Sequence, residues 1–177
     1  PPESIYKAGA SYGGVGFGNT ATSTYGSATE PTDLGSGGGP CCSLGSAGGG
    51  AIQIFLAGTL TNNGLVSSSG TNSSSGGSIY VKTSSLSGVG SFQANGGGSY
   101  LGSIQYGPGG GGRIALYLQT SSFSGKAEAK GGCASYDGYS MSCAGDGTVG
   151  FFDTANNDFL VTTSWRFQKS DGPFNFN

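Results

Sequence analysis

The sequence predicts an all-β fold: a short right-handed parallel β-helix, or solenoid, with glycine-rich loops along one edge and a non-repeat C-terminal tail. A motif that opens on glycine and alternates apolar residues occurs four times. Glycine closes each unit, and no apolar period of 3.6 residues indicates helices. We therefore expect a solenoid over residues 1–158 and a C-terminal cap or inter-subunit segment over residues 159–177.

The composition supports a folded chain with many small positions. Glycine occupies 38 of 177 positions, without the strict three-residue period of collagen. Disordered chains have few aromatic residues and a high net charge, whereas this chain is 11% aromatic with a formal net charge of -2. The seven Lys and Arg residues are scattered, which argues against nucleic-acid binding. No apolar run approaches the roughly 20 residues of a membrane-spanning helix, so we expect no membrane insertion.

The repeat carries the fold prediction. Each unit opens as Gly-x-aliphatic-x-apolar, and the units start at residues 50, 77, 112 and 147. A second alternating stretch then closes each of the first three units on glycine. Stacked units about 4.8 Å apart would bury equivalent residues as ladders. The predicted ladders are Ile52/Ile79/Ile114/Val149, Leu60/Leu86/Phe123 and Val66/Phe92/Ala127.

The remaining segments are expected to form loops and ends. The region 8–18 resembles an incomplete first coil. Four glycine-rich segments fall at one phase of the repeat and should emerge along one edge of the solenoid: 30–50, 70–77, 96–112 and 131–147. The C-terminal tail carries four alternating aromatic residues suited to assembly: Trp165, Phe167, Phe174 and Phe176. The tail would either cap the stack or pair with a neighbouring subunit by strand addition.

The four cysteines have no zinc-type spacing and no histidine partners, so structural disulfides are favoured over redox activity. Cys133–Cys143 is the preferred pair, which leaves Cys41–Cys42, and crossed pairing stays open. Asn72 begins an N-glycosylation sequon. The chain opens on Pro-Pro-Glu without a signal-peptide pattern, so we expect a piece of a longer precursor. These features favour a secreted, extracellular location at a cell surface.

No constellation for catalysis or cofactor binding is present in the sequence. Histidine is absent, and none of the nine acidic residues forms a DxD-like pair. Asp153 and Asp158 suit a turn better than a calcium site. We therefore expect no enzyme activity, no cofactor and no metal. Four tyrosines in the predicted loops could stack on sugar rings or shield glycine backbone: Tyr100, Tyr106, Tyr136 and Tyr139.

Three stretches resemble a known family. These are Ser11–Gly14 (SYGG), Tyr25–Gly39 (YGSATEPTDLGSGGG) and Gly48–Ile52 (GGGAI). They are similar to the glycine-rich repeat domains of large extracellular proteins from bacteria, algae and other protists. The resemblance covers about residues 9–152 and implies a parallel β-helix and a surface location. It offers no catalytic residues, and neither the Cys41-Cys42 pair nor the aromatic tail belongs to the family pattern.

We therefore expect an extracellular structural module that serves as the self-assembling subunit of a filament or cell-surface appendage. Its partners would be copies of itself or neighbouring domains of a larger surface protein. The alternative is an adhesin or carbohydrate-binding module that binds glycans through the loop tyrosines, with ice binding by the Ser/Thr ladders as a third reading.

Overall fold

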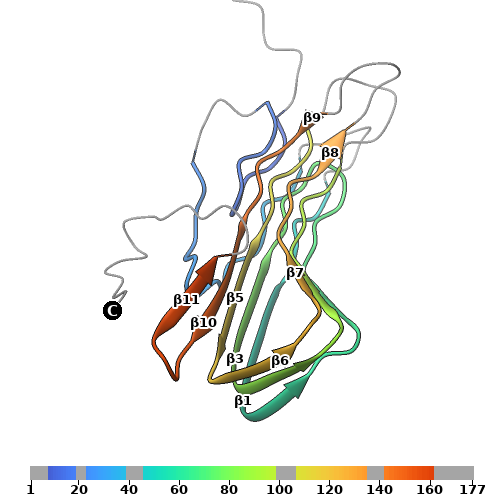
Figure 1. Cartoon of the computed structure of the whole chain (residues 1–177). Coiled ribbons are helices and arrows are strands. Elements are labelled where there is room, and N and C mark those ends of the chain that lie inside the picture. Colours follow the sequence, from blue (N-terminus) through green and yellow to red (C-terminus); the bar gives the residue numbers. More distant parts are fainter. Residues whose placement is uncertain (1–7, 19–22, 39–45, 99–106, 135–141, 162–177) are drawn as a thin grey trace, which may run out of the picture.

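The computed structural model describes residues 8–18, 23–38, 46–98, 107–134 and 142–161. Every regular element in these ranges is a β-strand. Figure 1 shows the long strands side by side in one half of the molecule, while the glycine-rich segments run on from them into the other half. The strands are β1 (Ala51–Thr61), β2 (Leu65–Ser67), β3 (Ser78–Gly88), β4 (Ser91–Gln93), β5 (Arg113–Leu118), β6 (Thr120–Phe123), β7 (Lys126–Glu128), β8 (Cys133–Ala134), β9 (Ser142–Cys143), β10 (Thr148–Asp153) and β11 (Asp158–Val161).

The largest sheet is built from the openings of the four repeats. Its strand order is β1-β3-β5-β10-β11, and β6 also pairs with β3. The first four strands are parallel and in register, so that Ile52, Ile79, Ile114 and Val149 are successive pairing partners. Because alternate residues share a face, this register places one aliphatic side chain of each strand directly beside the next.

A second sheet closes the other side of the core. It consists of the short parallel strands β2, β4 and β7, whose central residues Val66, Phe92 and Ala127 pair in turn. Phe92 is fully buried and packs with the inward aliphatic side chains of the larger sheet. The strands of both sheets form because their β-branched, aliphatic and aromatic side chains alternate with polar residues over a shared apolar interior.

The predicted β-helix is not what the structure contains. The molecule is all-β, but its sheets are small, and they mix parallel with antiparallel pairing: β11 runs antiparallel to β10, and β8 antiparallel to β9. The reason lies in the turn after β10. The Asp153 carboxylate accepts hydrogen bonds from the amides of Ala155 and Asn156, and Asn157 takes a positive φ of 54°. This turn sends the chain back along β10 instead of onward into another parallel strand.

One of the predicted ladders is offset. Leu60 pairs with Leu86 as the alignment indicates, but Leu86 pairs with Ser121, and Phe123 lies opposite Gly88. The Phe123 ring nevertheless reaches the core, since its centroid lies 5.6 Å from that of Phe92. A slip of two residues keeps each side chain on its face of the strand, and therefore the apolar pattern alone cannot detect it.

The described residues of the glycine-rich segments pack against one another instead of projecting from an edge as loops. Four successive amides of residues 109–112 donate backbone hydrogen bonds into the molecule. The amides of Gly109 and Gly112 donate to the carbonyls of Gly97 and Ala94, which belong to one neighbouring segment. The amides between them donate to two other segments, at Ala10 and Gly145, and all four N···O distances are 2.7 to 3.0 Å. Amides three residues apart therefore bond to the same neighbouring segment, and three residues is the period of a polyproline II helix.

Close backbone contact explains why these positions are glycine. A Cβ on Gly111 would lie 1.9 Å from the carbonyl oxygen of Ala129, and one on Gly110 would lie 2.1 Å from that of Gly14. Neither distance admits a side chain, and both obstacles are backbone atoms. The glycine segments thus form a hydrogen-bonded layer that continues the molecule beyond the apolar core.

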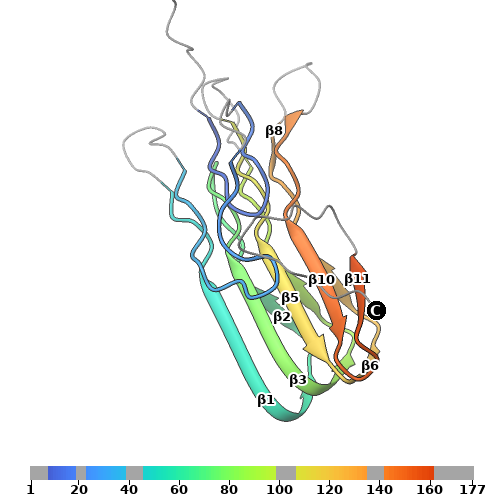
Figure 2. The ribbon, with the colours of Figure 1, turned by 90° about the vertical axis from the view of Figure 1, so that its left-hand side faces the viewer.

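The N-terminal region, which comprises residues 8–18 and 23–38, lies across the outer face of the main sheet (Figure 2). Residues 8–18, expected to be an incomplete coil, contain no strand and instead bond to the glycine layer. The Tyr12 hydroxyl lies 2.6 Å from the Ser78 hydroxyl at the start of β3. Tyr80 of β3 donates to the Glu30 carboxylate at 2.9 Å. The outer face is therefore covered near the glycine layer and open toward the turns.

Candidate assembly surfaces

Several residues singled out by the sequence fall outside the described ranges. They are Cys41, Cys42, Tyr100, Tyr106, Tyr136, Tyr139, Trp165, Phe167, Phe174 and Phe176. Asn72 of the sequon is described. It is exposed, has a φ of 32° and lies in a tight turn in which the amide of Ser74 donates to the carbonyl of Thr71. Its side chain is therefore at the surface, as a glycan attachment site requires.

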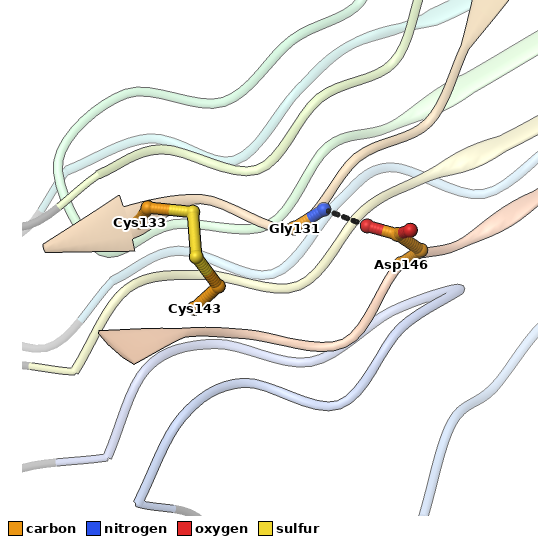
Figure 3. The surroundings of a disulfide bond; sticks show 4 residues. All are labelled: Gly131, Cys133, Cys143 and Asp146. Atoms are coloured by element: carbon orange, nitrogen blue, oxygen red, sulfur yellow. Dashed lines mark hydrogen bonds between the residues drawn. A yellow bond between two sulfur atoms is a disulfide. The ribbon is translucent and has the colours of Figure 1, made fainter. Parts of the chain in front are cut away.

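Cys133 and Cys143 form a disulfide bond across β8 and β9 (Figure 3). Their Cα atoms are 4.1 Å apart, and the two residues are direct partners in the antiparallel pair. The carboxylate of Asp146 accepts a hydrogen bond from the amide of Gly131 at 2.8 Å, which ties the two strands together beyond the bridge. The disulfide rules out crossed pairing of these cysteines with Cys41 and Cys42, and it is compatible with an extracellular protein.

One end of the strand array is an unpaired edge. In the described part of the chain, no strand pairs with the outer side of β1 or of β2. The side chains here are exposed to an unusual extent for their size: Phe55 is 61% exposed, Leu56 43% and Leu65 61%. A row of unpaired amides and carbonyls beside exposed apolar groups is a template for strand addition.

Two rows of glycine reach this same end. Gly77, Gly112 and Gly147 open successive units, and a Cβ on any of them would lie 1.8 to 2.1 Å from the carbonyl oxygen of the preceding opening glycine. Gly50 opens the first unit, and a Cβ there would meet nothing within 4 Å. The first glycine of this row therefore has open space where each later one meets backbone.

The second row repeats this arrangement beside the smaller sheet. A Cβ on Gly125 would lie 1.9 Å from the carbonyl of Gly90, and one on Gly90 would lie 2.3 Å from that of Gly64, whereas one on Gly64 would meet nothing within 4 Å. Both sheets thus end on a glycine whose close backbone neighbour is lacking in the described structure.

The opposite end of the array contains a groove of about 570 Å³. It lies between β10–β11 and β6–β7, with apolar walls that include Phe123, Ala127, Phe151 and Leu160. The charged residues that line it are Lys126, Glu128, Asp153 and Asp158. Three of these four are acidic. Asp153 has its pKa lowered, chiefly by a hydrogen bond from the Asn156 side chain, so its carboxylate stays charged in a turn role.

Aromatic rings form a continuous row on the outer face of the main sheet. Phe55, Tyr80 and Tyr117 follow one another edge to face, with centroids 5.3 and 5.8 Å apart. Phe152 stacks on Tyr117 at 4.2 Å, and Phe159 on Phe152 at 4.6 Å. Such contacts stabilise neighbouring strands. A groove of about 620 Å³ beside this row carries polar groups, among them Lys82, Thr83 and Gln119.

Glu30 and Lys82 lie beside the middle of this row. Lys82 lies 3.3 Å from the Glu30 carboxylate and over the rings of Tyr80 and Tyr117. The pKa of Glu30 is lowered, first by the hydrogen bond from Tyr80 and then by that from Lys82. Burial, followed by the bond to Glu30, raises the pKa of Tyr80 well above its ordinary value. This cluster fastens the N-terminal region to β3.

A second cluster fastens the same region closer to the glycine layer. Arg113 is fully buried at the start of β5, and its Nε donates to the carbonyl of Tyr25 at 3.1 Å. Its guanidinium lies 5.5 Å from the centroid of the Tyr12 ring. Burial raises the pKa of Tyr12 to about 12, against the opposing effects of the Ser78 hydrogen bond and the Arg113 charge. The cluster positions the N-terminal region rather than offering a reactive group.

The described ranges contain no group of three or more His, Cys, Asp or Glu side chains arranged to hold a metal ion. Nor do these ranges contain a helix long and apolar enough to cross a membrane.

Comparison with known proteins returns no relative. No family model, curated protein or solved structure matches the chain. The described structure is all-β, and the two ends of its strand array differ in shape and charge.

Sequence reasoning missed both the aromatic row and the open glycine positions, and of the two only the aromatic row leaves a signal in the sequence. Phe55, Tyr117 and Phe152 all stand five residues after the opening glycine of their units, and Lys82 holds that position in the second unit. Recording the outward as well as the inward positions of the repeat would have predicted the aromatic row. The open positions required knowing which strand lies at the end of the sheet.

Proposed function

We propose that this chain is an extracellular structural module that assembles head to tail with copies of itself, as the subunit of a filament or cell-surface appendage. The observation that carries the proposal is the unpaired edge of β1. The eleven-residue strand β1 pairs with β3 on one side and has no strand partner on its outer side in the described structure, where the side chains of Phe55 and Leu56 are exposed. A strand edge of this length with exposed apolar side chains is normally protected, because it otherwise pairs with another chain.

The two glycine rows support a backbone as the partner of this edge. Inside the molecule, each later glycine of a row accommodates the carbonyl of the unit before it. Gly50 and Gly64 leave the same space for a backbone carbonyl of a neighbouring copy. Such a contact would explain why glycine occurs at these positions, because glycine in an extended strand otherwise destabilises the fold. A second copy would thus approach β1 and β2 as closely as one unit approaches the next.

The segment that we assign to this role is the C-terminal one. Residues 164–177 include Trp165, Phe167, Phe174 and Phe176, with polar residues between Trp165 and Phe167 and between Phe174 and Phe176. This alternation suits an added strand that buries one face. Since the segment follows β11 at one end of the array and β1 lies at the other, donation from copy to copy builds an open chain rather than a closed dimer.

An extracellular location is part of the proposal. The Cys133–Cys143 disulfide and the exposed Asn72 sequon support it. Mass spectrometry of the native material would test it, because a glycan on Asn72 requires passage through a secretory pathway. Native protein with reduced cysteines would contradict it.

Deletion of residues 164–177 is the direct test of the assembly mechanism. We expect the full chain to sediment as polymers and the truncated chain as a β-rich monomer, with unchanged far-ultraviolet circular dichroism. The variant Leu65→Lys should also prevent polymers, because it places a charge on β2, at the end of the array that would accept the donated strand. Val89→Lys is the matched control: Val89 is 70% exposed at a corner away from both ends. Polymerisation of the truncated chain would refute strand donation.

The aromatic row favours a second candidate function, glycan binding. Aromatic faces beside hydroxyl, amide and ammonium groups are a common surface for sugars, and the 620 Å³ groove combines Phe55 and Tyr117 with such groups. The rings differ from the loop tyrosines that the sequence suggested. A glycan array that shows selective binding, lost in Tyr117→Ala but kept in Val89→Lys, would favour this function over assembly.

A further inference from the structure

We infer that the groove between β10–β11 and β6–β7 binds the C-terminal segment of its own chain, residues 162–177, before assembly. The partner is thus a part of this molecule, and the contact holds the donor segment back. Only the effect on assembly rests on the proposed function, because binding of the segment in the groove is a property of the single molecule.

The first argument is the missing strand of the smaller sheet. Val66, Phe92 and Ala127 form its inward row, and β7 has no partner on its outer side in the described structure. Phe92 is fully buried, whereas Ala127 is partly exposed and lines the groove. A small residue ends the row where the core opens, and this leaves room for a large side chain from a following strand.

The second argument is proximity. The segment begins directly after Val161, which pairs with Gly150 of β10. Three residues before Gly150, the amide of Gly147 donates to the carbonyl of Ala129, which follows β7 by one residue. Three residues of extended chain span about 10 Å. The segment therefore leaves β11 close to the end of β7, and its effective concentration at the groove is high.

The third argument is complementary chemistry. Residues 162–169 contain Arg166 and Lys169 and no acidic residue, whereas three of the four charged side chains that line the groove are carboxylates. In an extended segment Trp165 and Phe167 share one face and Arg166 takes the other. A strand beside β7 would thus turn both aromatic rings toward Phe123 and Phe151 and would bring Arg166 to the outward side of Glu128, which already pairs with Lys130 at 3.2 Å.

The chain offers an intrinsic probe, because Trp165 is its only tryptophan. We expect the Trp165 fluorescence of the full-length monomer to be blue-shifted and shielded from acrylamide, to an extent independent of protein concentration. Leu160→Lys places a charge on the wall of the groove and should raise the quenching constant several-fold, toward the value in denaturant. Val89→Lys should leave it unchanged. Leu160 is 61% exposed, so neither variant removes a buried side chain.

A charge exchange adds specificity. Glu128→Lys should raise quenching, and the double variant Glu128→Lys/Arg166→Glu should restore the shielding. Quenching of Trp165 as strong in the native monomer as in denaturant would overturn the inference. So would shielding that grows with protein concentration, since a second copy would then hold the segment, or shielding that Leu160→Lys leaves intact.

The consequence for assembly is read separately by sedimentation. Release of the segment should shorten the lag before polymers form, so Leu160→Lys should assemble faster than the natural chain. A shielded Trp165 in a protein that never polymerises would support the groove contact and contradict the proposed function. An exposed Trp165 in a protein that polymerises would do the reverse.

Discussion

At the scale of single residues, buried tyrosines fix the N-terminal region onto the strand array. Tyr12 is fully buried, and its hydroxyl lies against Ser78, while Tyr80 donates to Glu30. Burial raises the pKa of both phenols, because their ionised forms lose solvation. The contacts that hold the outer face together are therefore made by neutral phenols.

This arrangement predicts alkaline destabilisation. Between pH 10 and pH 12 an unfolded chain releases the Tyr12 proton while the folded chain retains it, so the free energy of unfolding falls as the pH rises through that window. The loss from Tyr12 alone is about 3 kcal/mol at most. Urea unfolding at a series of pH values measures it. Tyr12→Phe should reduce the slope of the free energy of unfolding against pH between these values, and an equally steep curve in that variant would show that Tyr12 is not a cause.

At the scale of elements, the repeat predicted the strands well and their surroundings poorly. The alignment of Ile52, Ile79, Ile114 and Val149 coincides with the observed register, because a period of two over a buried face leaves little freedom. The antiparallel β11 was not foreseen, since it depends on how the Asp153 carboxylate bonds to the turn that follows. Local side-chain bonding of this kind leaves no periodic signal.

The glycine segments were misread for a different reason. Composition predicts loops where glycine is abundant, yet residues 107–113 are buried and hydrogen-bonded to several neighbouring segments. Because glycine has no side chain, the sequence of a glycine segment does not indicate which neighbouring segment it packs against. Among the candidate sites, the Cys133–Cys143 bond was predictable from spacing, whereas the groove and the β1 edge required the order of strands in the sheets.

One pair of substitutions tests the account of the glycine rows. A Cβ on Gly112 would lie 2.1 Å from the carbonyl oxygen of Gly77, so Gly112→Ala should lower the free energy of unfolding by about 1–3 kcal/mol or more. Gly50→Ala is the matched control at the same position of the first unit, where a Cβ meets nothing, and its effect on the monomer should stay within about 0.5 kcal/mol. Equal losses in urea unfolding would contradict the account.

The same control has a second use. If a neighbouring copy approaches Gly50 as one unit approaches the next, Gly50→Ala should weaken polymerisation while it leaves the monomer intact. Sedimentation measures this directly. Polymers of Gly50→Ala that form at the same concentration as those of the natural chain would mean that no backbone packs closely at that position.

At the scale of the whole molecule, the two ends explain the proposed role. One end offers a long strand edge and two open glycine positions, and the other offers a groove with a predominantly acidic rim followed by an aromatic segment. The ends are not alike, and contacts between unlike surfaces propagate instead of closing on themselves. The interior needs no partner, because the apolar core and the glycine layer lie within one chain.

The most direct measurement of this account is amide hydrogen exchange along β1 in monomers and in assembled material. Strand addition predicts that the β1 amides that face away from β3 exchange rapidly in the monomer and become strongly protected in the polymer. Polymers in which these amides still exchange as they do in the monomer would contradict it, because the copies would then be held together by some other surface.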